Sequence, residues 1–240
     1  MSQIIDINTM FGPHPSAAAD LSVDELESMM QKHGVGLCCT LSTVGMLLDH
    51  NSGNAATRAA CAEHTTLLPV ATVNPQMVFD MEGPFTRFKA EGFRMVRLFP
   101  DWQGWDPDYA PCVAIAKRLE PEGLPLMVEI TGTGIATRLV TALVGHPAPL
   151  ILGGITQETV AEAITLMRSH SAIYIETSHL VAVGAIRQVA DSVGADRILY
   201  GSGAPARPMA SGLAAVKHAG LSEAQSTQVL GGNARALLGI

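Results

Sequence analysis

Eight short apolar segments alternate with longer segments of helical character along this chain, and this alternation is the feature that most constrains its fold. The apolar segments carry almost unbroken valine, isoleucine and leucine, which is typical of strands buried on both faces of a parallel sheet. The sequence therefore predicts parallel strands joined by helices. The expected strands are residues 3–9, 34–42, 67–75, 93–100, 124–130, 149–154, 172–178 and 197–202.

Helical segments fill the intervals between these strands. The first begins at Ser22, a residue suited to helix capping, and stops at Gly34. Eight strand-then-helix units in 240 residues fit a compact (β/α)8 TIM barrel, and a doubly wound open sheet is the alternative. No Ser/Gly-rich linker interrupts the pattern, so we expect one domain over residues 1–240. The expected helices are residues 22–34, 53–64, 80–92, 109–123, 133–146, 156–170, 179–194, 209–220 and 222–239.

Charge and composition argue against several kinds of partner. The formal net charge is −7 and no run of five lysines or arginines occurs, so we expect neither nucleic acid nor an anionic membrane as a partner. No apolar run approaches the roughly 20 residues of a transmembrane helix. The start of the chain, MSQIID, lacks the basic and apolar regions of a signal peptide. A cytoplasmic location is therefore expected.

Four cysteines occur in the chain, at positions 38, 39, 61 and 112, without a C-x-x-C spacing. This pattern is typical of reduced core residues in a cytoplasmic protein. Cys38 and Cys39 are adjacent in an expected strand, so their side chains should lie on opposite faces.

In a TIM barrel, the chemistry lies at the carboxyl ends of the strands. The residues to consider are therefore those that end each expected strand or begin the loop after it. They are Asn8, Met10, His14, Thr43, Asn74, Arg97, Asp101, Trp102, Glu129, Thr131, Gly154, Glu176, Ser178, His179, Ser202, Gly203 and Arg207.

Several stretches together carry a resemblance to a known family. They are IIDINTMFGPH, SGNAATRAACAEHTTLLPVATVNPQ, EGFRMVRLFPDWQGWDPD, LPLMVEITGTG, LILGGIT, GADRILYGSGAP and LSEAQSTQVLGGNARALLG. In this order they resemble the amidohydrolase superfamily, specifically the amidohydrolase-related (amidohydrolase 2) group of metal-dependent TIM-barrel hydrolases and decarboxylases. The resemblance implies a distorted (β/α)8 barrel with a pocket at the strand ends.

The resemblance also implies a divalent-metal centre, but this chain differs at each of its positions. The first-strand His-x-His of the family falls on Asn8 and Met10, and the fifth-strand His falls on Glu129. The sixth-strand His falls on Gly154 and the eighth-strand Asp on Gly203. A catalytic zinc site uses about three protein ligands, whereas amide oxygen and thioether sulfur bind Zn²⁺ weakly and glycine has no ligating side chain. We therefore expect no metal and no other cofactor.

Three residues are the catalytic candidates, namely Glu129, Arg97 and His179. Glu129 is interpreted either as half of a structural ion pair with an arginine at the former metal position or as a general acid or base. Arg97 or Arg207 is suited to bidentate binding of a carboxylate. His179 is either a solvated or helix-capping loop residue or a catalytic group, and His14 is expected to be a solvated or helix-capping residue.

The other strand-end residues are interpreted as ligand-binding. Trp102 is expected either to pack over the barrel mouth or to form the wall of a pocket. Ser202 does not match a G-x-S-x-G nucleophile motif, so its hydroxyl is expected to bond the backbone. Thr131 begins TGTGIAT, whose helix start offers backbone N–H groups to an anion. The ligand-binding candidates are Asn8, Met10, Trp102, Thr131, Gly154, Ser202, Gly203 and Arg207.

Two kinds of function fit these residues. In the first, the protein is a catalytically degenerate relative that binds a small carbonyl or carboxylate ligand or serves as a partner subunit. It would then be a homo-oligomer, or a hetero-oligomer with an active homologue. In the second, it is a metal-independent hydrolase, lactonase or lyase that acts on a small carboxylated metabolite and polarises a carbonyl with cations and hydrogen bonds.

Overall fold

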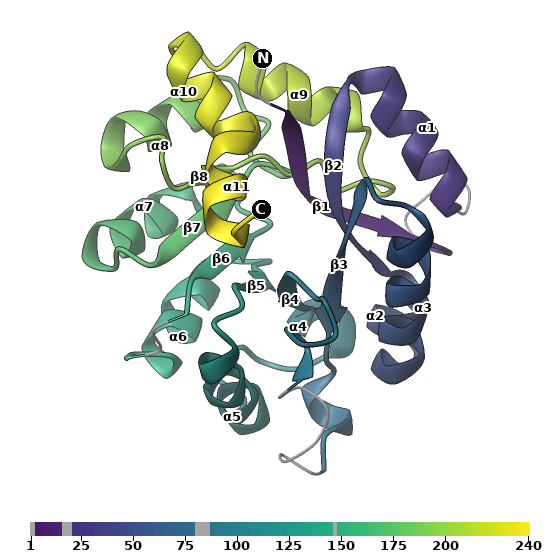
Figure 1. Cartoon of the computed structure of the whole chain (residues 1–240). Helices are drawn as coiled ribbons and strands as arrows, with labels where there is room; N and C mark the ends of the chain where they lie inside the picture. Colours follow the sequence, from purple (N-terminus) through teal and green to yellow (C-terminus); the bar gives the residue numbers. More distant parts are fainter. Residues whose placement is uncertain (1–2, 16–20, 80–86, 146–147) are drawn as a thin grey trace.

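The computed structural model describes residues 3–15, 21–79, 87–145 and 148–240, and these form a (β/α)8 TIM barrel (Figure 1). Each strand pairs in parallel with the next, in the order of the sequence. All eight expected strands are confirmed, and most are shorter than expected. The strands are β1 (Ile4–Phe11), β2 (Val35–Ser42), β3 (Leu67–Thr72), β4 (Met95–Leu98), β5 (Leu126–Glu129), β6 (Leu150–Gly153), β7 (Ile173–Glu176) and β8 (Ile198–Leu199).

Backbone hydrogen bonds between the first and last strand regions close the barrel. The N–H of Ile7 donates to the carbonyl of Tyr200, and the N–H of Met10 donates to that of Ala204. In return, the N–H of Gly203 donates to the carbonyl of Asn8. These bonds lie beyond the short strand β8, so the segment after β8 is held against β1 where the candidate site lies.

Helices surround the sheet, and most of them match the sequence expectations. Ser22 caps the first helix in a capping box with Glu25, and Gly34 ends it in the left-handed conformation with φ of 69°. Of the helix expected over residues 80–92, residues 88–92 form turns, and residues 80–86 lie outside the described part. The helices are α1 (Val23–His33), α2 (Thr43–Leu47), α3 (His50–Glu63), η1 (Pro75–Met77), α4 (Pro100–Gln103), α5 (Ala110–Leu119), η3 (Glu120–Glu122), α6 (Ile135–Ala142), α7 (Val160–Ser169), α8 (Ala185–Val193), α9 (Met209–Lys217), α10 (Glu223–Thr227), η4 (Gln228–Gly232) and α11 (Asn233–Leu238).

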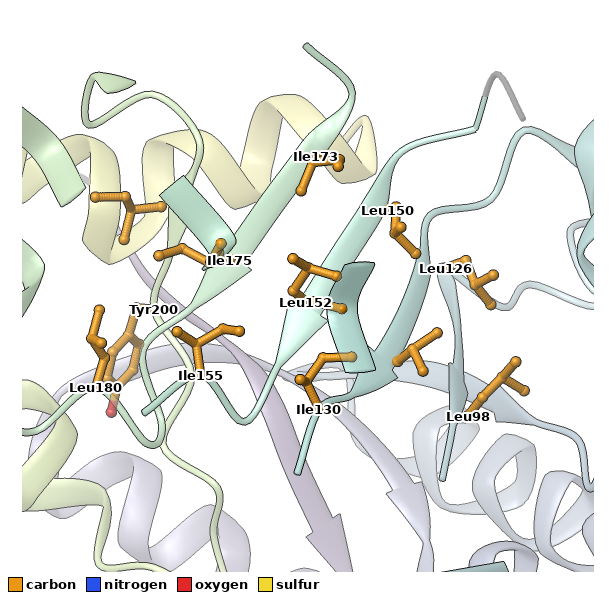
Figure 2. Packing of buried hydrophobic residues seen from close by; sticks show 14 of the residues in the cluster. Leu98, Leu126, Ile130, Leu150, Leu152, Ile155, Ile173, Ile175, Leu180 and Tyr200 are labelled. Atoms are coloured by element: carbon orange, nitrogen blue, oxygen red, sulfur yellow. The ribbon is translucent and has the colours of Figure 1, made fainter. Parts of the chain in front are cut away.

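The core has two parts that follow the alternation of the strands. Outward-facing residues such as Leu152 and Ile175 pack between the sheet and the helices (Figure 2). Inward-facing residues such as Met95 and Met127 fill the barrel interior. Cys38 belongs to the outer part and Cys39 to the inner one, as their adjacency predicts. The cysteines are free.

The C-terminal helix covers the end of the barrel opposite the site. Ala234 and Leu238 of α11 belong to the interior cluster. The preceding short π-helix, η4, contacts β1, and a Cβ on its Gly231 would lie 2.2 Å from the carbonyl oxygen of Gln3. The amino-terminal end of the barrel is therefore closed by packing, and the carboxyl ends of the strands remain for a ligand. No helix in the described residues is long and apolar enough to cross a membrane.

Candidate functional site

The site lies where the inward-facing positions of the strands reach the carboxyl end of the barrel. On β4, Met95 faces the interior, and Arg97 is two residues further along the same face. On β5, Met127 and Glu129 repeat this arrangement. Polar side chains therefore form the layer above the apolar interior.

Arg97 is the centre of this layer. Its Nη1 donates to Oδ1 of Asn8 over 2.5 Å, and its Nη2 donates to Oε2 of Glu129 over 3.1 Å. The guanidinium also lies 4.5 Å from the ring centroid of Phe99, an arrangement that favours a cation. The Arg97 side chain is only 4% exposed and that of Glu129 only 16%, so the pair is largely removed from water.

Asn8 lies at an irregularity in the first strand. The pairing of β1 with β2 shifts register between Asp6 and Thr9, and Asn8 falls within this shift. Its oxygen accepts from Arg97, and its Nδ2 donates to Oγ of Ser178 over 3.3 Å. Asn8 thus connects the Arg97–Glu129 ion pair to a second polar group.

This second group surrounds the buried carboxylate of Glu176 at the end of β7. Glu176 accepts hydrogen bonds from the backbone N–H of Gly154 over 3.0 Å and from that of Ser178 over 2.7 Å. It also accepts from the hydroxyl of Ser178 over 2.7 Å. A Cβ on Gly201 would lie 2.3 Å from Oε2 of Glu176, so glycine is needed to accommodate this carboxylate.

His179 connects the buried group to the cavities. Its Nδ1 lies 2.9 Å from Oγ of Ser178. Burial lowers the pKa of His179, and the charges of Arg207 and Arg97 act in the same direction, whereas Glu176 and Glu129 oppose them. His179 is therefore biased towards its neutral form at neutral pH.

Two adjoining cavities open at this end of the barrel, and Glu129 and His179 line both of them. The first has a volume of about 220 Å³ and the second about 330 Å³. The first is lined by Asn8, Met10, His14, Arg97, Trp102, Glu129, His179, Gly203, Ala206 and Arg207. The second is lined by Glu129, Ile130, Thr131, Gly132, Thr133, Gly154, Thr156, Glu158, Thr159 and His179.

The structure thus places the three catalytic candidates and most of the ligand-binding candidates around the two cavities. Ser202 is different, because it is 1% exposed and lines neither cavity. Its Oγ accepts from the N–H of Ala204 over 3.1 Å, which matches the expected bond to the backbone. Its own N–H donates to Oδ1 of Asp6. Ser202 therefore supports the strand end and is not placed to contact a ligand in these cavities.

The environment of His14 differs from the one that the sequence predicts. A solvated or capping role was expected, but His14 is 6% exposed and lines the first cavity. Its ring meets that of Trp102 edge-on, with centroids 5.3 Å apart. Burial lowers the pKa of His14. The only signal in the sequence was its place in the loop after the first strand.

The start of α6 also differs from the expectation that it would offer free N–H groups to an anion. Glu162 of α7 accepts from the N–H of Gly134 over 2.8 Å and from that of Thr137 over 2.7 Å. A carboxylate of the chain itself thus already occupies this helix start.

Two glycines stand where the resemblance places metal-binding side chains. Gly154 has φ of 73°, and a Cβ there would lie 2.8 Å from the carbonyl oxygen of Ile130. Gly203 has φ of 74°. Within the described residues, no group of three or more His, Cys, Asp or Glu side chains is arranged to hold a metal ion.

A (β/α)8 barrel with a polar cavity at the carboxyl ends of its strands defines a class of proteins that support many different reactions. Residues 85–240 match the family model described as amidohydrolase, and the chain therefore belongs to the amidohydrolase family. The expected family is thus confirmed. No curated protein matches the sequence.

Solved structures of decarboxylases resemble the whole chain. A 2,6-dihydroxybenzoate decarboxylase complexed with 2,6-dihydroxybenzoate has a TM-score of 0.81 at 14% identity, covering 100% of both chains. A dihydroxybenzoic acid decarboxylase from Polaromonas, with bound manganese and the inhibitor 2-nitroresorcinol, has a TM-score of 0.79 at 15% identity, covering 100% of this chain and 97% of the other. A 5-carboxyvanillate decarboxylase from Sphingomonas paucimobilis has a TM-score of 0.74 at 14% identity, covering 99% of each chain. At these identities the likeness establishes the fold.

Proposed function

We propose that this protein binds a small carboxylate ligand at the strand-end cavities without a divalent metal, with the guanidinium of Arg97 standing in the place of the metal. The observation that carries the proposal is the bridge that Arg97 makes between Asn8 and Glu129. These residues stand at two of the positions where the resemblance expects metal ligands. A fixed cation therefore already binds their oxygens.

The donor set supports this proposal. Glu129 is the one anionic side chain among the five matched positions, and a catalytic zinc site uses about three ligands with an open position. A divalent ion beside Glu129 would also lie next to the positive charge of Arg97, which repels it. The residues present do not fit a catalytic metal, so we assign no reaction step to one.

The lining of the first cavity favours an anion, and in particular a flat one. Arg207 lines it without a carboxylate partner within 4.0 Å among the described residues. The ring of Trp102, which is 40% exposed, forms part of the wall. Two of the similar structures are decarboxylases of dihydroxybenzoates, which are aromatic carboxylates. We therefore choose benzoate as the probe for this chain.

The metal part of the proposal is tested by elemental analysis. The protein is purified without chelator, incubated with Zn²⁺ or Mn²⁺ and desalted before measurement. We expect far less than one metal ion per chain. A content near one ion per chain that disappears in Glu129→Gln would overturn the proposal.

The carboxylate part is tested by calorimetric titration of the metal-analysed protein with benzoate and with its neutral analogue benzamide. We expect benzoate to bind more tightly than benzamide. We expect Arg207→Gln to weaken benzoate binding by roughly 10- to 150-fold, because a charge-assisted hydrogen bond contributes about 1.5–3 kcal/mol. Arg138→Gln is the matched control, since Arg138 is an exposed arginine paired with Asp106 and Asp108. Equal binding of benzamide, or equal losses in the two variants, would contradict the proposed site.

A second candidate function is a metal-independent hydrolase, lactonase or lyase. The observation that favours it is the connection of His179, through Ser178, to the buried Glu176. Such a connection prepares a histidine for proton transfer.

A further inference from the structure

The hydroxyl of Ser178 lies at the junction of three polar groups. It donates to Oε1 of Glu176 over 2.7 Å and accepts from Nδ2 of Asn8 over 3.3 Å. Its third neighbour is Nδ1 of His179, at 2.9 Å. Because a hydroxyl has a single proton and that proton is directed to Glu176, the serine oxygen is an acceptor for its other two neighbours.

This arrangement selects one tautomer of His179. A hydrogen bond between Nδ1 and the serine oxygen requires the proton to be on Nδ1. In the neutral ring, Nε2 is then left with its lone pair. Asn8 supports the same direction, since its oxygen is bound to Arg97 and its amide nitrogen is therefore the atom that donates to Ser178. The two hydrogen bonds that link these residues therefore run in one direction, from His179 to Ser178 and from Ser178 to Glu176.

The ring of His179 is half-buried and forms part of the wall of both cavities. Four charged groups from four elements act on it: Glu176 from β7, Glu129 from β5, Arg97 from β4 and Arg207 from the segment after β8. Two of the four are cations that offset negative charge on a bound molecule. Burial of the ring, together with these cations, keeps the imidazole neutral and able to accept a proton.

We propose that His179 is the catalytic base of this site and accepts, through Nε2, a proton from a small carboxylate substrate whose carboxylate group is held at Arg207. Ser178 and Glu176 are positioning residues that fix the tautomer. The inference rests on the proposed carboxylate site and deepens it by giving that site a reaction.

The proton transfer is balanced within the site. The proton leaves a hydroxyl or activated C–H group next to the carboxylate and forms a bond to Nε2, so the ring becomes an imidazolium ion. The electron pair stays on the substrate atom, and the charges of Arg97 and Arg207 stabilise it. The positive charge of the ring is stabilised through Ser178 by Glu176. No oxidant or other reactant is required.

Iodoacetate tests both parts of this proposal, because it is a small carboxylate that alkylates a neutral imidazole nitrogen. The lone pair of Nε2 would displace iodide and form a carboxymethyl group on that atom. The neutral reagent iodoacetamide reacts by the same displacement without the carboxylate. Rates at each histidine are measured by peptide mass spectrometry, and NMR identifies the alkylated nitrogen of the product.

His170 is the internal control for these rates. Its Nδ1 also lies near an oxygen, 3.1 Å from the carbonyl of Leu166, but its ring is exposed on the outside of the barrel. We expect the ratio of iodoacetate to iodoacetamide rates to be at least tenfold higher at His179 than at His170. The product at His179 should be the Nε2 derivative.

Variants test separately the binding of the carboxylate group at Arg207 and the tautomer of His179 that Ser178 fixes. Arg207→Gln should lower the ratio of iodoacetate to iodoacetamide rates at His179 to that of His170. Ser178→Ala should give alkylation at both ring nitrogens and shift the pH profile of labelling, whereas Ser178→Thr should restore the single product.

Equal ratios at His179 and His170, or alkylation of wild-type His179 at Nδ1, would overturn the proposal. These outcomes are independent of the metal analysis and of the benzoate titration. If the protein binds benzoate without metal but shows no directed alkylation, the proposed function stands and the assignment of His179 as the base is wrong.

Discussion

Arg97 and Glu129 form an ion pair across neighbouring strands, with Nη2 and Oε2 3.1 Å apart. The two residues belong to β4 and β5, and each stands two positions beyond a methionine of the barrel interior. The pair is therefore held by two rigid strands and not by loops. Each partner limits the cost of burying the other.

Removal of the arginine should destabilise the protein. Arg97→Met leaves Glu129 largely buried without its cation and should lower the free energy of unfolding by about 3–5 kcal/mol. Urea denaturation measures this change. Arg187→Met is the control, because Arg187 pairs with Asp191 at the surface and such a pair contributes about 0–1 kcal/mol. Adding Glu129→Gln to Arg97→Met should recover part of the loss, and equal losses in the two arginine variants would contradict the role of the pair.

Gly154 should not accept the histidine that the family has at this position. Its φ of 73° disfavours any side chain, and a Cβ would lie 2.8 Å from the carbonyl oxygen of Ile130. We expect Gly154→His to lower stability by about 1–3 kcal/mol and not to create a zinc site. Thermal denaturation with and without Zn²⁺ measures both effects. Gly132→Ala is the comparison, because its nearest atom would be Cγ1 of Ile135 at 3.7 Å. Zinc-dependent stabilisation of Gly154→His would contradict this expectation.

Asp6 should make stability depend on pH. Burial raises its pKa from 3.8 to about 7, against hydrogen bonds from Ser202 and Asn8. Between these two values the folded protein keeps the proton and the unfolded chain has lost it, so the unfolded state binds fewer protons and stability falls as pH rises. A shift of this size corresponds to roughly 4 kcal/mol in total.

Asp6→Asn tests this dependence. The amide is neutral at every pH, so the variant should gain stability relative to the wild type between pH 4 and pH 7 by an amount on the order of that figure. Urea denaturation of both proteins at several pH values gives the difference. A constant difference across this range would show that Asp6 is ionised in the folded protein.

Glu162 should contribute to the stability of α6 from a neighbouring helix. Glu162→Ala removes the acceptor of the N–H groups of Gly134 and Thr137, and we expect a loss of about 0.5–2 kcal/mol. Asp24→Ala is the control, since Asp24 is an exposed acid in the first turn of α1. The control should change stability by less than about 0.5 kcal/mol. Chemical denaturation compares the two, and similar small changes would show that the Glu162 contacts contribute little.

The barrel was predictable from the sequence because its signals are local. Each buried strand is a short apolar run, and each long helix has a regular period and recognisable ends, as at Ser22 and Gly34. The helices α2 (Thr43–Leu47) and α4 (Pro100–Gln103) were not predicted, since elements this short do not complete a detectable period.

The site was predictable only as a set of positions. The rule that barrel chemistry lies at the strand ends brought Asn8, Arg97 and Glu129 together correctly. Their connections were not predictable, because no local pattern tells which donor meets which acceptor across the barrel. The carboxylate of Glu162 at the start of α6 is a further example, since it comes from another helix.

The bridge that Arg97 makes between Asn8 and Glu129 has a consequence for how such a protein depends on its surroundings. A guanidinium that belongs to the chain cannot dissociate, be removed by a chelator or be exchanged for a competing ion. The positive charge at this point is part of the polypeptide, so no metal ion has to be inserted after synthesis. A protein of this kind would be ready to bind its ligand as soon as it has folded, whatever the supply of metal in the cell.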